Sequence, residues 1–471
     1  MLRLRARIPV AGAVPGCAGA ALGARPWRGR HCATLAVLLV APTLPLPAAA
    51  TDPPAQSSSP SAPVSAPAPD TAAPPAPPKP VDSVDLPSWL RLDALPFIPI
   101  PEVSTAPHEG VTVGVFPVML SSNGDGQINQ ILAPDILHSQ YFGWGARWRT
   151  FRNPSDDEKW SLVAGAKQSV EREFDAEYDV GLRRDTDWSW IYHAMYDRSG
   201  TGRFYGFGNN TTAADRTTFI DTQIRAEVTA ARNFTHAVQL AYELRADTVE
   251  IASSVLNGLP SIESRFPLLT GVGEVTEVQQ RLVLTYDTRD SVVLPHSGQR
   301  LAAFAGLSAR ALGGSVRYSF LGIDGSEYRP VNRDLTLVGH LAARYMPSYL
   351  DAPFWATSQI GGDRSIVAEG QPLRGYGAGR WWDRNSFSAS IEARQWVRSF
   401  HFFSSDLKLE LAPFVDTGKV FSTMDESPLS HLHVAGGMGF RVVVSPFVVG
   451  YLDVGIGKEK LAFFSGIDYP F

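Results

Sequence analysis

The sequence has almost no cysteine. Its only two cysteines, Cys17 and Cys32, lie in the first fifty residues, so the rest of the chain can form no disulfide. This absence is informative because a chain that enters an oxidising compartment could use disulfides for stability. The remaining chain must therefore be stabilised by packing or by a closed sheet.

Long hydrophobic runs are also scarce. The one long apolar run, residues 33–50, is interrupted by three prolines, whereas a transmembrane helix needs about 20 apolar residues in a row. The mean hydropathy of the chain is −0.07. The sequence therefore does not predict a helical membrane protein.

The same apolar run has the layout of an export signal. It follows three arginines between residues 25 and 30 and ends in Ala48-Ala49-Ala50, as in a secretory signal peptide. We expect a signal peptide at residues 1–50, cleaved after Ala50. An alternative is a lipoprotein cysteine at Cys17, although the preceding Val-Pro-Gly makes a poor lipobox.

Positive charge is not in excess. Removal of the six arginines of residues 1–50 changes the formal net charge from −5 to −11. An acidic chain does not suit the phosphate backbone of nucleic acids. We therefore expect no nucleic-acid partner.

Motifs of common enzymes are missing as well. The sequence has no His-Glu-x-x-His, no Gly-x-Ser-x-Gly and no phosphate-binding loop. His431 and His433 could meet a metal, but two histidines in a loop are weak support, and the Asn-Gly and Asp-Gly pairs of residues 121–127 are turn signals. We expect no enzyme activity, no cofactor and no metal.

Composition divides the chain into three parts. Residues 51–80 hold eleven prolines with many alanines and serines, a composition that cannot bury a core. We expect a disordered periplasmic linker at residues 51–108 and one domain at residues 109–471. The linker could be a passive spacer, could hold something away from a membrane, or could bind a partner.

Alternation of apolar and polar side chains begins near Gly110. In residues 386–400, Phe387, Ala389 and Ile391 fall on one parity, whereas serines, Glu392 and Arg394 fall on the other. Successive side chains of a strand point to opposite faces, so this segment has an apolar and a charged face. Such strands suit a soluble sandwich or a membrane barrel.

The length of the strands favours a transmembrane antiparallel β-barrel. They run for about 11 to 15 residues, against a usual 5 to 6 in globular sheets, and a dense charged parity suits a wet lumen. We predict about sixteen strands, with fourteen or eighteen as alternatives. Their expected spans are 110–120, 140–152, 159–170, 172–183, 188–200, 217–232, 234–250, 276–290, 297–311, 313–328, 333–348, 386–400, 406–420, 433–444, 447–458 and 460–471.

The last predicted strand ends in an aromatic residue. Phe471, Tyr469 and Ile467 share one parity, as in the terminal strand of barrels that fold into the outer membrane. Pro470 removes one ladder donor and indicates an edge or terminal position. We interpret Ile467, Tyr469 and Phe471 as a C-terminal barrel signal.

Four stretches carry a more specific pattern. They are Tyr286–Asp290, Leu373–Tyr376, Phe414–Gly418, and Gly437–Arg441 with Ser445-Pro446 and then Asp453, in that order and before a terminal phenylalanine. Together they resemble the C-terminal barrel of the BamA/TamA-like bacterial surface antigen family. That family forms sixteen-stranded outer-membrane barrels that insert or translocate other polypeptides.

The resemblance implies a loop that folds back into the lumen. Its tip would be Arg374, Gly375 and Tyr376. The tip would dock on the strand that carries Phe414, Asp416 and Gly418. Parity agrees, because Asp416 shares its face with other charged residues. Arg374 would pair with Asp416, or with Glu392 as a second candidate, and Gly375 would permit a sharp turn. The alternative is an ordinary exposed loop.

Two other motifs are less decisive. Asp287, Arg289 and Asp290 precede a Pro-Gly turn, and they could belong to a lumen network or form a structural turn with local charge pairs. Residues 202–209 read as a surface loop with aromatics at the membrane interface.

The resemblance implies a barrel-only family member in the outer membrane of a Gram-negative bacterium. Residues 51–109 leave no room for a periplasmic POTRA domain, which receives client chains in the family.

The first hypothesis for the function is outer-membrane protein insertion or polypeptide translocation. The second is a passive pore or structural barrel, and a membrane enzyme comes third. The expected partners are outer-membrane lipid and lipopolysaccharide, with client outer-membrane proteins or periplasmic factors as further candidates. The sequence does not predict an oligomeric state.

Overall fold

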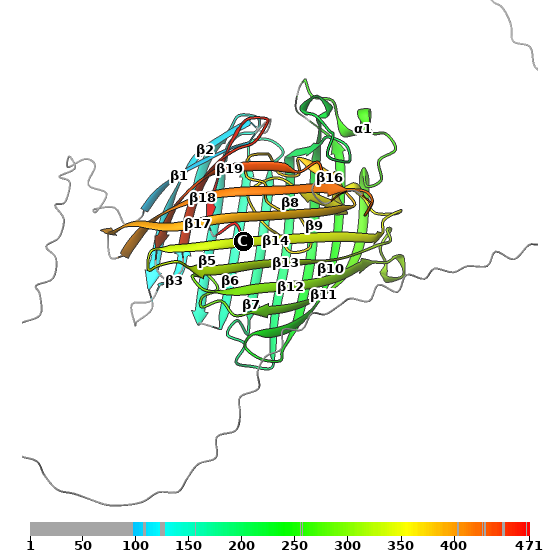
Figure 1. Ribbon diagram of the computed structural model, residues 1–471. Helices are drawn as coiled ribbons and strands as arrows, with labels where there is room; N and C mark the ends of the chain where they lie inside the picture. The colour runs from blue at the N-terminus through cyan, green and yellow to red at the C-terminus, as the bar shows by residue number, and fades with distance from the viewer. Residues whose placement is uncertain are drawn as a thin grey trace, which may run out of the picture. The chain divides into compact units, whose positions relative to one another are not determined.

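The chain forms β-strands almost throughout its described part (Figure 1). A computed structural model describes residues 98–106, 110–122, 128–155, 157–254, 256, 258–402, 405–425, 427, 430–444, 448–467 and 469–471. The predicted signal peptide and the linker up to residue 97 lie outside the described residues. Among those described, no helix combines the length and hydropathy needed to cross a membrane.

The elements follow one another along the chain as a long meander. The strands are β1 (Ile98–Ala106), β2 (Gly110–Ser122), β3 (Ile128–Leu132), β4 (Asp135–Ser139), β5 (Gly143–Ser155), β6 (Glu158–Lys167), β7 (Arg172–Val180), β8 (Trp188–Phe204), β9 (Thr217–Asn233), β10 (Val238–Ser253), β11 (Gly273–Asp287), β12 (Gly298–Ser308), β13 (Tyr318–Pro330), β14 (Leu335–Ser348), β15 (Ser358–Ile360), β16 (Trp381–Asp383), β17 (Asn385–Phe402), β18 (Ser405–Phe421), β19 (His433–Val444), β20 (Val448–Ile456) and β21 (Leu461–Ile467). The short helices are η3 (Ala213–Asp215), α1 (Ile262–Arg265), η4 (Arg310–Leu312) and η5 (Phe354–Ala356).

The large sheet is antiparallel, and its two ends meet. Apart from β3 and β4, successive strands of this sheet pair with each other, β14 pairs with β17, and β1 pairs with β21. Both β3 and β4 lie between β2 and β5, so they share one position in the ring. The described strands therefore fill eighteen positions, with β15 and β16 in a separate two-stranded sheet.

Eighteen positions match the upper alternative of the sequence analysis rather than sixteen. Each of the sixteen predicted spans overlaps an observed strand, and the two missed positions are β1 and β3/β4. Prolines hid both. Pro134 divides β3 from β4, and Pro99 and Pro101 lie in β1, which has β2 as its only registered partner at these residues. Proline is tolerated at such an unpaired edge. The sheet thus begins at Ile98, inside the segment that the sequence assigned to the linker.

The strands have polar faces inside and apolar faces outside. On β10, Glu243 and Asp247 are buried, whereas Leu240, Tyr242 and Leu244 are exposed. This polarity is the reverse of that of a soluble protein, and it suits a wet lumen surrounded by lipid. The predicted transmembrane antiparallel β-barrel is confirmed.

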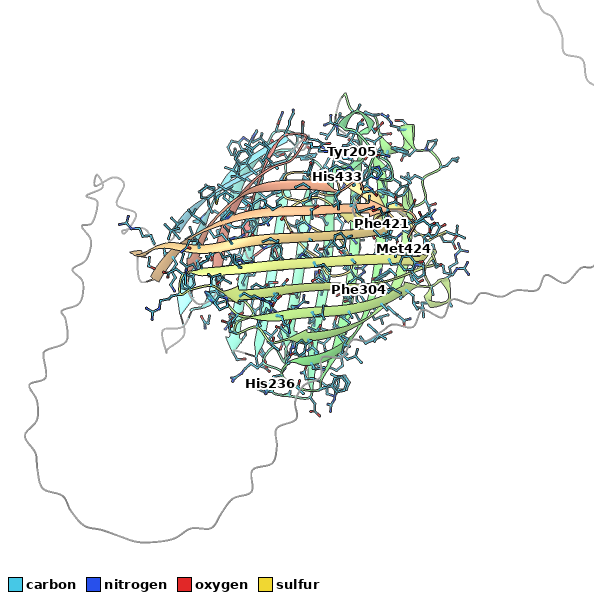
Figure 2. All side chains as sticks on the ribbon, in the orientation of Figure 1. Tyr205, His236, Phe304, Phe421, Met424 and His433 are labelled. Carbon is cyan, nitrogen blue, oxygen red and sulfur yellow. The ribbon has the colours of Figure 1, made fainter. Side chains whose placement is uncertain are left out.

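The two ends of the barrel differ. We call the end with the long β14–β17 connection the loop end, and the opposite end the turn end. Figure 2 labels Tyr205, His433 and Phe421 towards the loop end, away from His236 in the β9–β10 turn. The last residue is marked over β14 in Figure 1.

Among the described residues, the contact between the first and last strands has the fewest registered pairs in the ring. Between β1 and β21, one residue pair is in register among the described residues, Thr105 with Phe463. The Ser465 hydroxyl also donates to the Val103 carbonyl oxygen at 2.8 Å. By contrast, β20 and β21 share seven registered pairs, and β1 and β2 share nine. We call the β1–β21 contact the seam.

Candidate lumen latch

The connection from β14 to β17 enters the barrel instead of staying outside. We call residues 349–384 the latch loop. Within it, β15 pairs with β16, and the intervening chain descends towards the lumen wall. A compact apolar cluster joins the loop to that wall: Ile360, Leu373, Tyr376 and Trp381 from the loop, with Val420 and Ala435 from β18 and β19.

Arg374 lies at the centre of the site and has no exposed side-chain surface. Its Nε and Nη2 donate to the two carboxylate oxygens of Asp416, each at 2.9 Å, and its backbone amide donates to Asp416 Oδ2 at 2.9 Å. Its Nη1 donates to Glu392 at 2.6 Å and to Asp453 at 3.1 Å. The planar guanidinium thus makes the bidentate pair for which arginine is suited. Three strands, β17, β18 and β20, supply the carboxylates.

Two further arginines complete the charge network on the same wall. Arg441 donates to both Glu392 oxygens, at 2.7 and 2.8 Å, and to Glu410 at 3.2 Å. Arg394 donates to Glu392 Oε1 at 2.8 Å. Burial of charges is costly unless they are paired and hydrogen-bonded. Glu392 therefore depends on three arginines at once.

Aromatic rings cover the guanidinium of Arg374. The ring centroid of Phe414 lies 3.6 Å from its Cζ, and that of Phe471 lies 5.6 Å away. A cation over a ring gains electrostatic attraction, and more so when water is excluded. The structure thus brings Arg374, Phe414, Asp416 and Glu392 together, as the sequence predicted from the resemblance.

Gly375 serves both a sharp turn, which the Tyr376 amide closes by donating to the Leu373 carbonyl oxygen at 3.0 Å, and a close approach to β20. Its φ is outside the left-handed region, but a Cβ there would lie 2.6 Å from the backbone of β20. Similarly, a Cβ on Gly455 would lie 1.7 Å from the Arg374 carbonyl oxygen. Two glycines facing each other therefore let the loop tip touch the strand, in addition to the turn that we expected at Gly375.

Tyr376 fixes the tip on the next segment. Its ring lies over Gly457, its hydroxyl accepts from the Lys458 amide at 2.8 Å, and its centroid is 4.7 Å from that of Trp381. A Cβ on Gly418 of β18 would lie 3.4 Å from Ile360 of the loop, an ordinary contact. Tyr376 therefore positions the loop tip, whereas Gly418 only packs beside the loop.

Residues 202–209 lie only in part at the surface, where the sequence placed them: Phe207 is 48% exposed, but two other aromatics of the segment are not. Phe204 and Tyr205 are buried, and the Gly208 amide donates to the Trp382 carbonyl oxygen at 2.8 Å. Arg380 of the latch loop lies 4.2 Å over the Tyr205 ring and donates to Glu459 at 2.7 Å. The segment packs against the latch loop because its aromatics find an apolar partner there.

Asp287, Arg289 and Asp290 lie at the turn end, away from Arg374. Arg289 donates to Asp287 at 2.7 and 2.9 Å. Asp290 accepts from the backbone amides of His296 and Ser297. Partial burial raises the pKa of Asp290, but these two hydrogen bonds outweigh it and hold the pKa below the ordinary value of 3.8. The structure favours the structural-turn interpretation.

The C-terminal residues differ most from their prediction. β21 ends at Ile467, and Tyr469 and Phe471 turn into the lumen instead of continuing the strand. The Phe471 carbonyl oxygen accepts from the Tyr328 hydroxyl at 3.1 Å. The interpretation of Tyr469 and Phe471 as part of a terminal strand is therefore wrong. Pro470 supplies no ladder donor at its own position, but β21 has already ended at Ile467.

Sequence reasoning left four network members out of the site. These are Arg394, Glu410, Arg441 and Asp453. Each lies on the charged parity of its strand, and two belong to segments already noted as motifs. Their signal was available, but which charges meet across strands depends on register, which one sequence does not specify.

The lumen contains a polar cavity beside β1 to β8. This cavity of about 340 Å³ is lined by Glu102, Arg147, Lys167, Glu173 and Asp197, among other residues. Arg147 donates to Glu102 and Asp135 at 2.8 and 2.9 Å but keeps a fifth of its side chain exposed.

The described part of the chain contains no cluster of three or more His, Cys, Asp or Glu residues placed to hold a metal ion. The His433 ring instead stacks on Trp381 at a centroid distance of 3.6 Å. The centre of the latch site is a set of buried, paired charges, which suits a reversible ionic contact.

The chain is similar to one family model and to several solved structures. The model of the Omp85 superfamily domain matches residues 159–450. Among solved structures, BamA from Haemophilus ducreyi lacking POTRA domains 1-3 is 13% identical with a TM-score of 0.46, covering 78% of this chain and 75% of that one. CdiB from Escherichia coli is 11% identical with a TM-score of 0.44, covering 80% of this chain and 62% of that one. A search of curated proteins gives no match.

Proposed function

Because the chain belongs to the Omp85 superfamily, we propose that it inserts or translocates polypeptides at the outer membrane of a Gram-negative bacterium. The seam between β1 and β21 is the passage for the client chain. The observation that carries this proposal is the single registered pair at the seam, beside seven and nine pairs on its two flanks.

A weak seam exposes what a client strand needs. An unpaired strand edge offers rows of free N–H and C=O groups that another strand can join. In lipid these groups must be satisfied, so a barrel normally closes fully. A client strand that pairs with β1 or β21 would remove this cost while it enters the membrane.

The latch loop supplies the rigid side of such a gate. It ties β17, β18 and β20 together through Arg374, next to the strand that forms one edge of the seam. β21 therefore borders a fixed wall on one side and a weak contact on the other. Opening at the seam breaks fewer backbone pairs than opening between β17 and β18, which share fifteen.

The proposed partners follow from this route. They are unfolded outer-membrane proteins as clients, with outer-membrane lipid and lipopolysaccharide around the barrel, and periplasmic factors as candidates for delivery. The mechanism includes no covalent step, and it needs no cofactor.

A disulfide across the seam tests the proposal. The pair Thr105→Cys and Phe463→Cys lies in register and would lock the two strands. In proteoliposomes, the oxidised protein should insert an unfolded eight-stranded outer-membrane protein no better than empty liposomes, and reductant should restore insertion. The control is Ala176→Cys with Ala194→Cys, a registered pair between β7 and β8, which should leave insertion unchanged.

A passive pore is the second candidate, favoured by the polar cavity beside β1 to β8. Sugar-driven swelling of the same liposomes distinguishes the two. Insertion that persists with the seam locked, together with fast swelling, would contradict the gate and support the pore.

A further inference from the structure

The segment after β21 joins two parts of the molecule that the strand itself does not reach. We call Tyr469, Pro470 and Phe471 the hook. It leaves the turn end of β21 and turns up the lumen, where the Ser365 amide of the latch loop donates to the Pro470 carbonyl oxygen at 2.9 Å. The hook and the latch loop therefore enter the barrel from opposite ends and meet inside it.

Tyr469 is bound to the charge network beneath the latch. Its ring lies 3.7 Å from the Arg394 guanidinium and 5.0 Å from that of Arg441, and its hydroxyl donates to Glu410 at 3.2 Å. Rings over cations are attracted to them, most strongly where water is excluded. Tyr469 thus covers two of the three arginines that neutralise Glu392.

Phe471 contacts the opposite wall. Its ring stacks on His340 of β14, with centroids 4.7 Å apart and planes at 14°, and its carbonyl oxygen accepts from Tyr328 of β13. The ring is also 5.6 Å from the Arg374 guanidinium. One residue therefore touches the wall of β13 and β14 and the tip of the latch loop.

Ser365 links these contacts. Its hydroxyl donates to Asp324 at 3.1 Å and lies 3.3 Å from His340 Nε2, and its amide holds the hook. Withdrawal of the latch loop would therefore break the backbone bond to Pro470. Conversely, movement of β21 would pull the hook away from Ser365.

We propose that Tyr469 and Phe471 are positioning residues that couple the latch loop to the seam strand β21. This inference rests on the proposed function only in that β21 is one edge of the gate. With the hook in place, the seated latch holds β21 at its registered position beside β1. Without it, the latch and the seam open independently and more often.

The test uses the full-length chain with Tyr469→Ala and Phe471→Ala together. One readout is trypsin cleavage of the latch loop after Arg374 or Arg380, and the other is the rate of spontaneous disulfide formation between Thr105→Cys and Phe463→Cys in the same background. Loss of the two ring–cation contacts and the hydroxyl bond should raise cleavage about tenfold and lower disulfide formation several-fold. The matched control, Tyr286→Ala with Phe440→Ala, truncates two outward-facing aromatics and should change neither.

The outcomes separate this proposal from the gate itself. A change in the latch without a change at the seam, or no change in either, would overturn the coupling. If the alanine pair does not fold, as judged by migration of unheated samples on gels, Tyr469→Phe and Phe471→Leu remain. Each should give part of both effects. These readouts need no client, so the coupling can hold even where locking the seam leaves client insertion unchanged.

Discussion

The two halves of the lumen wall carry similar charges in different surroundings. On β17 to β20, Glu392, Asp416 and Asp453 have no exposed side-chain surface, because the latch loop covers them. On β5 to β8, Glu173 and Asp175 keep about a third or more of their side chains exposed. We call these the covered half and the open half.

Access of water determines how much each charged pair contributes to the stability of the fold. A pair that water can reach gains little net stability because solvent screens it. A fully buried charge that loses its partner cannot be rehydrated, so breaking the pair is expensive. The alternation of polar and apolar residues is the same in both halves, and the difference arises from the loop that fills one of them. The rigid half is therefore the half that the chain itself plugs, and the seam separates the last strand beside it from the first strand of the open half.

The largest expected effect comes from removing the central arginine of each half. Arg374→Ala leaves three buried carboxylates short of a partner and should lower the free energy of unfolding by about 3–5 kcal/mol. Arg147→Ala also removes contacts to Glu102 and Asp135, but Arg147 keeps a fifth of its side chain exposed and Arg149 still pairs with Asp135 at 2.9 Å, so the loss should be about 1 kcal/mol. Urea unfolding in liposomes, followed by tryptophan fluorescence, measures both. Equal losses would contradict the comparison.

A coupling energy sharpens the same contrast. In a cycle of Arg374→Ala and Asp416→Ala, the double variant should be less destabilised than the sum of the single variants, by about 1–3 kcal/mol. The equivalent cycle for His193 and Asp175, 2.8 Å apart in the open half, should give less than about 1 kcal/mol. Additive losses for Arg374 and Asp416 would exclude their pairing.

Backbone approach gives a test that leaves all charges in place. Gly455→Ala puts a methyl group where the Arg374 carbonyl oxygen lies, and it should displace the loop tip. Gly450→Ala on the other face of β20 meets nothing nearer than 4.0 Å and should be neutral. Cleavage of the latch loop by trypsin should rise only for Gly455→Ala. Protection of both variants would show that the tip does not depend on this contact.

The sequence predicted the strands well where alternation was regular. The periods of β10, β11 and β17 were readable because each strand has lipid on one side and a polar lumen on the other. β1 and β3/β4 were missed because prolines interrupt a pattern that pairing with neighbours nevertheless tolerates. The local composition of β1 and β3/β4 does not predict strands. Pairing with neighbouring strands stabilises them nevertheless.

The candidate site was predictable in part. Arg374, Asp416 and Phe414 came from a resemblance supported by parity, and the structure brings them together. Arg441 and Asp453 join through cross-strand register, which parity does not give. The structure of the hook was predicted wrongly. Tyr469 and Phe471 keep the alternation of β21 in the sequence, although the strand itself ends at Ile467.

The smallest expected effect on stability comes from a charged residue outside both halves. It serves as a reference for the charges of the covered half and the open half. Asp290 is exposed in the β11–β12 turn and accepts two backbone hydrogen bonds that hold its pKa below 3.8. A carboxylate whose pKa is lower in the folded state stabilises the fold above the unfolded pKa, and this contribution disappears as pH falls through the folded pKa. The wild type should therefore exceed Asp290→Asn in stability by less than about 1 kcal/mol at neutral pH, and the difference should vanish in acid below pH 3.8. Urea midpoints measured from neutral to acidic pH check this. A difference that persists unchanged at the lowest pH would mean that Asp290 acts through the shape of its turn and not through its charge.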